Sequence, residues 1–96
     1  MSLNEYDVLI SYDVNGKQDE VKEELNNIGY IDSFLFGDPK VHYYLPATTL
    51  WKKNTDVSSA KADMISVSNR LKVKLERFVV TKFDEFDAIT GVPYKS

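Results

Sequence analysis

The chain lacks cysteine, has a single histidine and contains no long apolar run, and each of these features removes a class of protein. Without cysteine there is no disulfide framework, no thiol nucleophile and no cysteine-ligated zinc or iron–sulfur site. The longest apolar runs extend over only a few residues, which is too short for a membrane-spanning helix or for the core of a secretory signal. We therefore expect a soluble, cytoplasmic protein that does not enter a membrane.

The 96 residues are enough for one domain with a two-layer core and too few for a second core. Hydrophobic residues make up 43% of the chain and charged residues 28%, the range of ordinary globular proteins. We expect one domain over residues 1–96, with its core at about 6–83 and an irregular tail at 84–96. Residues 1–3 look like the initiating methionine followed by a cloning remnant.

Charge is unevenly distributed along the chain, although the net charge is only −3. Residues 1–50 hold nine acidic side chains against three basic ones, a net −6, and residues 51–82 hold eight basic side chains against three acidic ones, a net +5. Such asymmetry marks an anion-binding face, allows two copies to dock head to tail, or reflects only a solvated basic helix and strand. The sequence leaves these explanations open.

Hydrophobic periodicity predicts two helices between strands. Residues 17–28 place Val21, Leu25 and Ile28 on one helical face, and Gly29 follows where a helix ends. The second helix is predicted to begin at an N-cap on Ser58 or Ser59, and its apolar stripe consists of Ala60, Met64, Val67 and Leu71.

Strands are predicted at residues 6–13, 30–36, 41–53 and 75–83, with a turn at 37–40 and an interruption at Pro46. The order strand, helix, strand, strand, helix, strand predicts an α+β, ferredoxin-like βαββαβ fold: a four-stranded antiparallel sheet with two helices on one face. The other sheet face stays uncovered, and Leu9 and Val79 on it favour pairing with a second copy as a homodimer.

Asp13 is the most informative single residue, because it ends the first predicted strand just before the turn formers Asn15 and Gly16. A carboxylate on rigid backbone beside an open loop suits a binding site. The ordinary alternative is a turn in which the Asp13 side chain bonds nearby backbone amides. For a metal, two copies of Asp13 across a dimer axis would meet the minimum that Mg²⁺ requires.

Other candidate residues are basic or aromatic. Trp51, Lys52 and Lys53 combine an aromatic plane with two cations, which suits single-stranded nucleic acid, although a tryptophan here more often fills the core. Arg70 and Arg77 extend the candidate nucleic-acid-binding set. His42 would suit a general base, but no nucleophile and carboxylate partner accompany it, so a structural role is the simpler interpretation and no catalytic residue is assigned.

Several segments together resemble a known family. They are residues 9–14 (Leu-Ile-Ser-Tyr-Asp-Val), the helix end at Ile28 and Gly29, residues 48–51 (Thr-Thr-Leu-Trp) and residues 75–80 (Leu-Glu-Arg-Phe-Val-Val). They resemble small ferredoxin-like proteins of the CRISPR-associated endoribonuclease and integrase-subunit superfamily, most closely its SinR-like branch, over about residues 6–82. The resemblance implies a symmetric dimer in which Asp13 of both subunits holds a divalent metal near a nucleic-acid phosphate.

The first helix departs from that family, whose nucleases have basic residues there, because Asp19, Glu20, Glu23 and Glu24 make its outer face acidic. We therefore expect a small homodimer that acts as a nucleic-acid-associated or interaction module with little or no catalysis, with RNA or DNA as a further partner. No cofactor is required. The alternative is a Mg²⁺-dependent endoribonuclease in which two Asp13 side chains hold the ion and the basic region 52–82 positions RNA.

Overall fold

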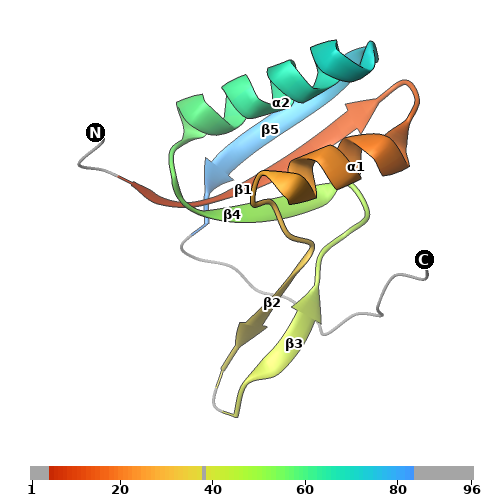
Figure 1. Ribbon diagram of the computed structural model, residues 1–96. Coiled ribbons are helices and arrows are strands. Elements are labelled where there is room, and N and C mark those ends of the chain that lie inside the picture. Colours follow the sequence, from red (N-terminus) through yellow and green to blue (C-terminus); the bar gives the residue numbers. More distant parts are fainter. Residues whose placement is uncertain (1–4, 38, 84–96) are drawn as a thin grey trace.

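The computed structural model describes residues 5–37 and 39–83, which form two helices and five strands (Figure 1). In chain order these are β1 (Tyr6–Val14), α1 (Gln18–Asn27), β2 (Ser33–Phe36), β3 (Val41–Tyr44), β4 (Thr49–Thr55), α2 (Val57–Leu71) and β5 (Leu75–Lys82). The predicted α+β class and the antiparallel pairing are confirmed. The tail predicted at 84–96 and the start at 1–3 lie outside the described residues.

The main sheet has three strands in the order β4, β1, β5, and β1 is antiparallel to both of its neighbours. Both helices lie on the same side of this sheet, and the β2–β3 hairpin extends away from it (Figure 1). Since α1 and α2 are the helices of residues 5–37 and 39–83, the other face of the sheet has no helical cover within that part of the chain.

The sheet differs from the predicted four-stranded sheet, because the segment expected as its second strand joins it at one residue. Ile31 forms an isolated antiparallel bridge with Trp51, and the two backbone N···O distances are both 2.9 Å. Beyond this bridge the chain pairs as β2 with β3 in a separate two-stranded sheet. Pro46 explains the separation, because it has no N–H for a ladder hydrogen bond and divides the strand predicted over 41–53 into β3 and β4.

The central strand β1 has two different faces, as its alternating sequence predicts. The even-numbered residues from Val8 to Val14 are buried beneath the helices, whereas the odd-numbered residues between them are partly exposed on the open face. The neighbouring strand β5 follows the same rule, since Phe78 and Val80 pack against the core while Val79 is 60% exposed. Strand pairing therefore aligns the open-face residues of β1 and β5 side by side.

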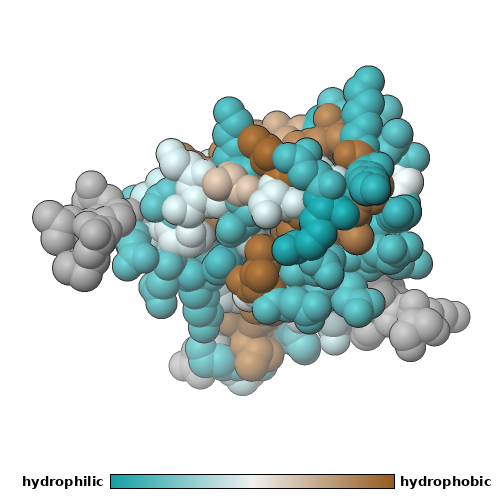
Figure 2. Space-filling model, turned by 45° about the horizontal axis from the view of Figure 1, so that its top comes forward, coloured by the Kyte–Doolittle hydropathy of each residue, from teal (hydrophilic) through white to brown (hydrophobic). Residues whose placement is uncertain are grey.

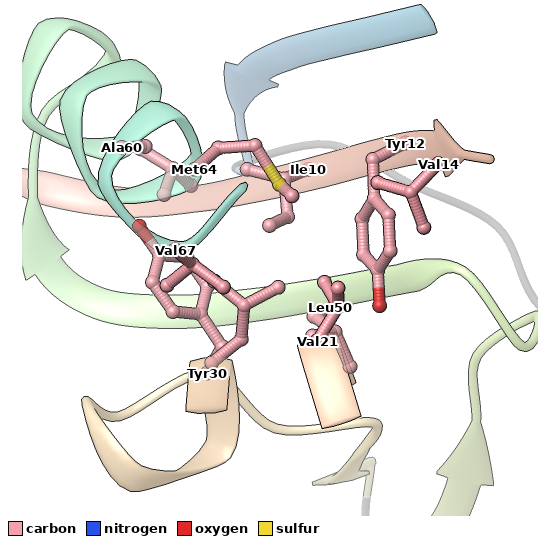
Figure 3. Packing of buried hydrophobic residues seen from close by; sticks show 11 residues of the cluster. Ile10, Tyr12, Val14, Val21, Tyr30, Leu50, Ala60, Met64 and Val67 are labelled. Atoms are coloured by element: carbon pink, nitrogen blue, oxygen red, sulfur yellow. The ribbon is translucent and has the colours of Figure 1, made fainter. Parts of the chain in front are cut away.

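The helices cover the sheet with the apolar stripes predicted for them (Figure 3). The buried members of these stripes are Val21 and Leu25 of α1 and Ala60, Met64 and Val67 of α2. Ile28 and Leu71, expected on the same stripes, lie at the helix ends, where Ile28 is 38% exposed and Leu71 is half-buried. Figure 2 shows the helical side from above, with hydrophilic residues over most of the surface and hydrophobic residues in the gaps between them.

Local signals set the helix ends. The N-cap of α2 is Asp56, so the prediction of Ser58 or Ser59 is wrong; Asp56 Oδ1 accepts a hydrogen bond of 2.7 Å from the backbone N–H of Ser59. At the end of α1, Gly29 has φ of 105°, a conformation that favours glycine, and the chain turns there into the buried Tyr30.

Candidate functional site

Asp13 lies opposite Arg77 in the pairing of β1 with β5. Arg77 Nε donates a hydrogen bond of 2.7 Å to Asp13 Oδ2, and both side chains are accessible, with exposed fractions of 44% for Asp13 and 76% for Arg77. This hydrogen bond and the negative charge of Asp13 raise the pKa of Arg77. The two residues border an open hollow of about 250 Å³ that Ser11, Tyr12, Phe78 and Val79 also line.

Asn15, the residue after β1, bonds the segment that precedes β5. The backbone N–H of Lys74 donates to Asn15 Oδ1 at 2.8 Å, and the backbone N–H of Asn15 donates to the Lys74 carbonyl at 3.1 Å. The ordinary alternative for Asp13, a local turn bond, is thus replaced by a contact across the sheet to Arg77.

The donor set at Asp13 does not form a magnesium site within one chain. Mg²⁺ needs one or two carboxylates with free oxygens, and one oxygen of Asp13 is bonded to a guanidinium. Within the part of the chain that the structure describes, no group of three or more His, Cys, Asp or Glu side chains could hold a metal ion. Among the described residues, Asp13 of one chain therefore offers a metal a single carboxylate, and a second copy would supply another.

The five residues predicted to bind nucleic acid do not share one surface. Trp51 and Arg77 lie on the open side of the sheet, because they pair with the odd-numbered Leu9 and Asp13 of β1, and Lys53 joins them there, with its Nζ 5.6 Å from the centre of the Trp51 ring. Lys52 lies on the helical side, where its Nζ is 3.6 Å from Asp63 Oδ2 and 5.2 Å from the centre of the Tyr30 ring. Arg70 of α2 bonds Glu24 of α1 at 2.7 Å.

Trp51 is part of an aromatic cluster that the sequence analysis did not identify. Its ring packs at a centroid distance of 6.2 Å from Phe34 and 5.8 Å from Phe83, and Phe34 stacks on Tyr43 at 5.4 Å. The indole N–H donates to the Ser33 carbonyl at 2.8 Å, and only 7% of Trp51 is exposed. The tryptophan therefore anchors the hairpin to β4 and does not present a free stacking surface for a base.

His42 has the serine partner that the sequence did not reveal. Its Nε2 lies 2.8 Å from Ser33 Oγ, and its ring stacks on Tyr44 at a centroid distance of 4.6 Å. The hairpin register makes this contact, since it pairs Leu35 with His42 and Ser33 with Tyr44 and so places all four side chains on one face. The turn at 37–40 is the sequence signal for this contact, because the turn fixes the register of the hairpin and the register brings Ser33 next to His42.

Tyr30 and Asp63 form a part-buried polar contact on the helical side. The Tyr30 hydroxyl donates to Asp63 Oδ2 at 2.9 Å. Burial of the phenol, together with its hydrogen bond to Asp63, raises the pKa of Tyr30 well above its ordinary value. This contact ties the end of α1 to α2 and keeps the Tyr30 phenol neutral.

Comparison of the chain with protein-family models, with curated proteins and with solved structures finds no match. The family resemblance of the segments above therefore stays a prediction. Neither helix of residues 5–37 and 39–83 is long and apolar enough to cross a membrane.

Proposed function

We propose that the chain is a homodimeric interaction module of ferredoxin-like topology, with little or no catalysis, and that its open sheet face is the contact surface. The observation that carries the proposal is the 60% exposure of Val79 on the sheet face that neither helix of the described residues covers. A large aliphatic side chain in a strand costs free energy in water, and a second copy of the chain would remove that cost.

The ferredoxin-like topology is supported by the place of Ile31. Its bridge to Trp51 lies on the outer side of β4, so the lateral order is Ile31, β4, β1, β5. Along the chain, the elements follow one another as first strand, helix, Ile31 bridge, third strand, helix and last strand, with the β2–β3 hairpin between the bridge and the third strand. This order supports a ferredoxin-like arrangement in which the second strand would be reduced to one residue pair.

The open face has the composition of a small interface, with apolar residues toward its middle and charges at its rim. Leu9 of β1 lies between Trp51 and Thr81, and Val79 is paired with Ser11. The neighbouring Asp13 and Arg77 carry opposite charges on the same face. A twofold axis that passes between Asp13 and Arg77 would bring each charge toward its opposite on the partner, so two identical copies would be complementary there.

Sedimentation equilibrium tests the dimer, since it should give about twice the chain mass of 11.0 kDa at micromolar concentration. Val79→Lys should return the mass to that of one chain, because it places a charge in the apolar part of the face. The matched control is Ile65→Lys, which changes an aliphatic side chain of similar exposure, 43%, on α2 and should leave the dimer intact. A monomeric wild type, or equal masses for both variants, contradicts the proposal.

The second candidate function is the Mg²⁺-dependent endoribonuclease. It is supported by the accessibility of Asp13, which is 44% exposed at the end of β1 and borders a hollow open to solvent. It rests on the dimer, because the described residues of one chain offer one carboxylate there, and it requires Arg77 to release that carboxylate or to contact the RNA phosphate itself. Association with RNA or DNA without cleavage rests on Lys53 and Arg77, the two cations of the predicted set on the open side.

A further inference from the structure

A second hollow, of about 510 Å³, lies between the β2–β3 hairpin and β4, away from Val79 on β5. It has the size of a small-molecule site. The residues that line it are Ile31, Ser33, Phe34, Leu35, Lys40, His42, Trp51 and Lys53. The hairpin register places Ser33, Leu35 and His42 on one hairpin face, and Phe34, from the other face, joins the lining beside Trp51.

The ionisable groups that line this hollow are basic. They are Lys40, His42 and Lys53, and none of the described lining residues is acidic, although the chain as a whole has a net charge of −3. The nearby Asp32 carboxylate is bonded at 2.9 Å to Lys22 of α1. Two lysine ammonium groups at one hollow attract an anion.

Polar hydrogen-bonding groups at the hollow are already oriented. The His42 ring is held against Tyr44 by stacking, and its Nε2 lies 2.8 Å from Ser33 Oγ. When Nε2 carries the proton of this contact, the Ser33 hydroxyl is free to donate to an anion. Lys53 Nζ is positioned 5.6 Å from the centre of the Trp51 ring, which keeps this ammonium group beside the hollow.

The rest of the lining is apolar and accessible. Ile31 is 41% exposed and Leu35 is 60% exposed, so both offer surface to a flat group. The Trp51 N–H is already bonded to the Ser33 carbonyl, which leaves the indole as an apolar wall. A ligand that satisfies both parts of the hollow has an anionic group with several oxygen acceptors at one end and an aromatic ring at the other.

We propose that this hollow binds a small monophosphate that carries a flat aromatic group, the chemical class of a nucleoside monophosphate. The phosphate oxygens accept hydrogen bonds from Lys40, Lys53 and Ser33. The aromatic group packs on Ile31 and Leu35. The site is complete within one chain, and none of these residues belongs to β1 or β5, although Lys53 of β4 lies on the same side of the sheet as Val79.

The test uses adenosine monophosphate as the probe and the fluorescence of Trp51, the single tryptophan of the chain, as the signal. The monophosphate should give a saturable change. Adenosine and inorganic phosphate each offer one half of the ligand, so each should bind more weakly than the monophosphate by about tenfold or more. Equal binding of adenosine overturns the role of the lysines, and equal binding of inorganic phosphate overturns that of the aromatic group.

Variants locate the site. Replacing both lysines, Lys40→Gln and Lys53→Gln, should weaken binding of the monophosphate by about tenfold or more, because two charge-assisted hydrogen bonds are lost. The matched control is Lys61→Gln, which removes an exposed lysine on α2. Thermal unfolding of each variant confirms that it is folded. Undiminished binding by the double variant refutes the proposal, as does an equal loss with Lys61→Gln.

The dimer and the ligand site are separated by Val79→Lys. This variant should be monomeric and should still bind the monophosphate with unchanged affinity. Loss of binding in that variant alone would show that the hollow depends on the dimer, which contradicts the independent site proposed here. A failure of the dimer in the wild type leaves the fluorescence experiment unaffected.

Discussion

Asp13 accepts a hydrogen bond of 2.7 Å from Arg77 Nε across the pairing of β1 with β5, so the carboxylate that ends β1 is neutralised by a cation of the same chain. The pair is accessible to solvent on both sides. An exposed ion pair contributes little to stability and is weakened by salt, because water and ions compete with it. The ion pair matters for metal binding, because Arg77 occupies one oxygen of the Asp13 carboxylate and so competes with a metal ion for it.

Asp13→Asn is expected to leave activity toward RNA unchanged, because we expect neither the wild type nor the variant to cleave single-stranded RNA in the presence of Mg²⁺. The amide keeps the shape of the carboxylate and removes its charge. The urea midpoint should move little, since the lost ion pair is exposed. The measurement is a cleavage assay with purified proteins at matched concentrations, together with urea unfolding.

Robust cleavage by the wild type that disappears in Asp13→Asn would establish the endoribonuclease in place of the interaction module. Glu23→Gln serves as a control for charge, since it also removes one negative charge and lies on the exposed face of α1. Cleavage that persists unchanged in Asp13→Asn would show that the activity does not depend on Asp13 and would contradict its role as the metal ligand.

Leu25→Ala should reduce the free energy of unfolding by about 2–5 kcal/mol, because Leu25 is fully buried and its removal leaves a cavity between α1 and the sheet. That loss is a large share of the stability of a domain of this size. Leu71→Ala should cost less, since Leu71 is half-buried at the end of α2. Urea unfolding checks both, and a larger effect at Leu71 would contradict the packing described here.

Tyr30→Phe should make stability less sensitive to alkaline pH. Folding raises the pKa of Tyr30 above its unfolded value near 10.0. The stabilisation from the neutral phenol is therefore complete below that unfolded pKa and is lost as pH rises through and beyond it. Between about pH 9 and pH 11, the wild type should lose more stability than the variant, as measured by urea unfolding at each pH.

Below pH 9 the same variant should be less stable than the wild type by about 0.5–1.5 kcal/mol, since it loses the hydrogen bond from Tyr30 to Asp63. Tyr43→Phe is the matched control, because it keeps the ring that stacks on Phe34 and removes a half-buried hydroxyl. It should follow the pH profile of the wild type. Parallel profiles for the wild type and Tyr30→Phe would show that the Tyr30 phenol is not the group responsible.

Ser68→Ala should leave the protein equally stable or stabilise it by up to about 1 kcal/mol. Ser68 is 3% exposed on α2, and its Oγ is the buried side-chain oxygen without a hydrogen-bond partner among the described residues. Alanine removes the desolvated hydroxyl and favours the helix. The exposed Ser66→Ala isolates the helix propensity, so a Ser68→Ala variant that is clearly less stable than Ser66→Ala would contradict this account.

Local physical chemistry, readable in the sequence, determined the helices, β1, β5 and most of the core. The apolar spacing of Val21 with Leu25, and of Ala60 with Met64 and Val67, depends on residues within two or three turns of one another. The alternation along β1 is equally local, since successive side chains of a strand point to opposite faces. Those features were predicted because neighbours in the chain are enough to create them.

Tertiary structure decided the pairing of strands and, with it, every contact of the candidate sites. Asp13 meets Arg77 across a separation of 64 positions, and Ser33 meets His42 only because the hairpin pairs in one register. Likewise, the expected second strand is reduced to the Ile31 bridge because the residues that follow it pair as β2 with β3 in a separate sheet. A shift of one residue reverses the faces of a strand, so such contacts depend on long-range register that local sequence does not specify.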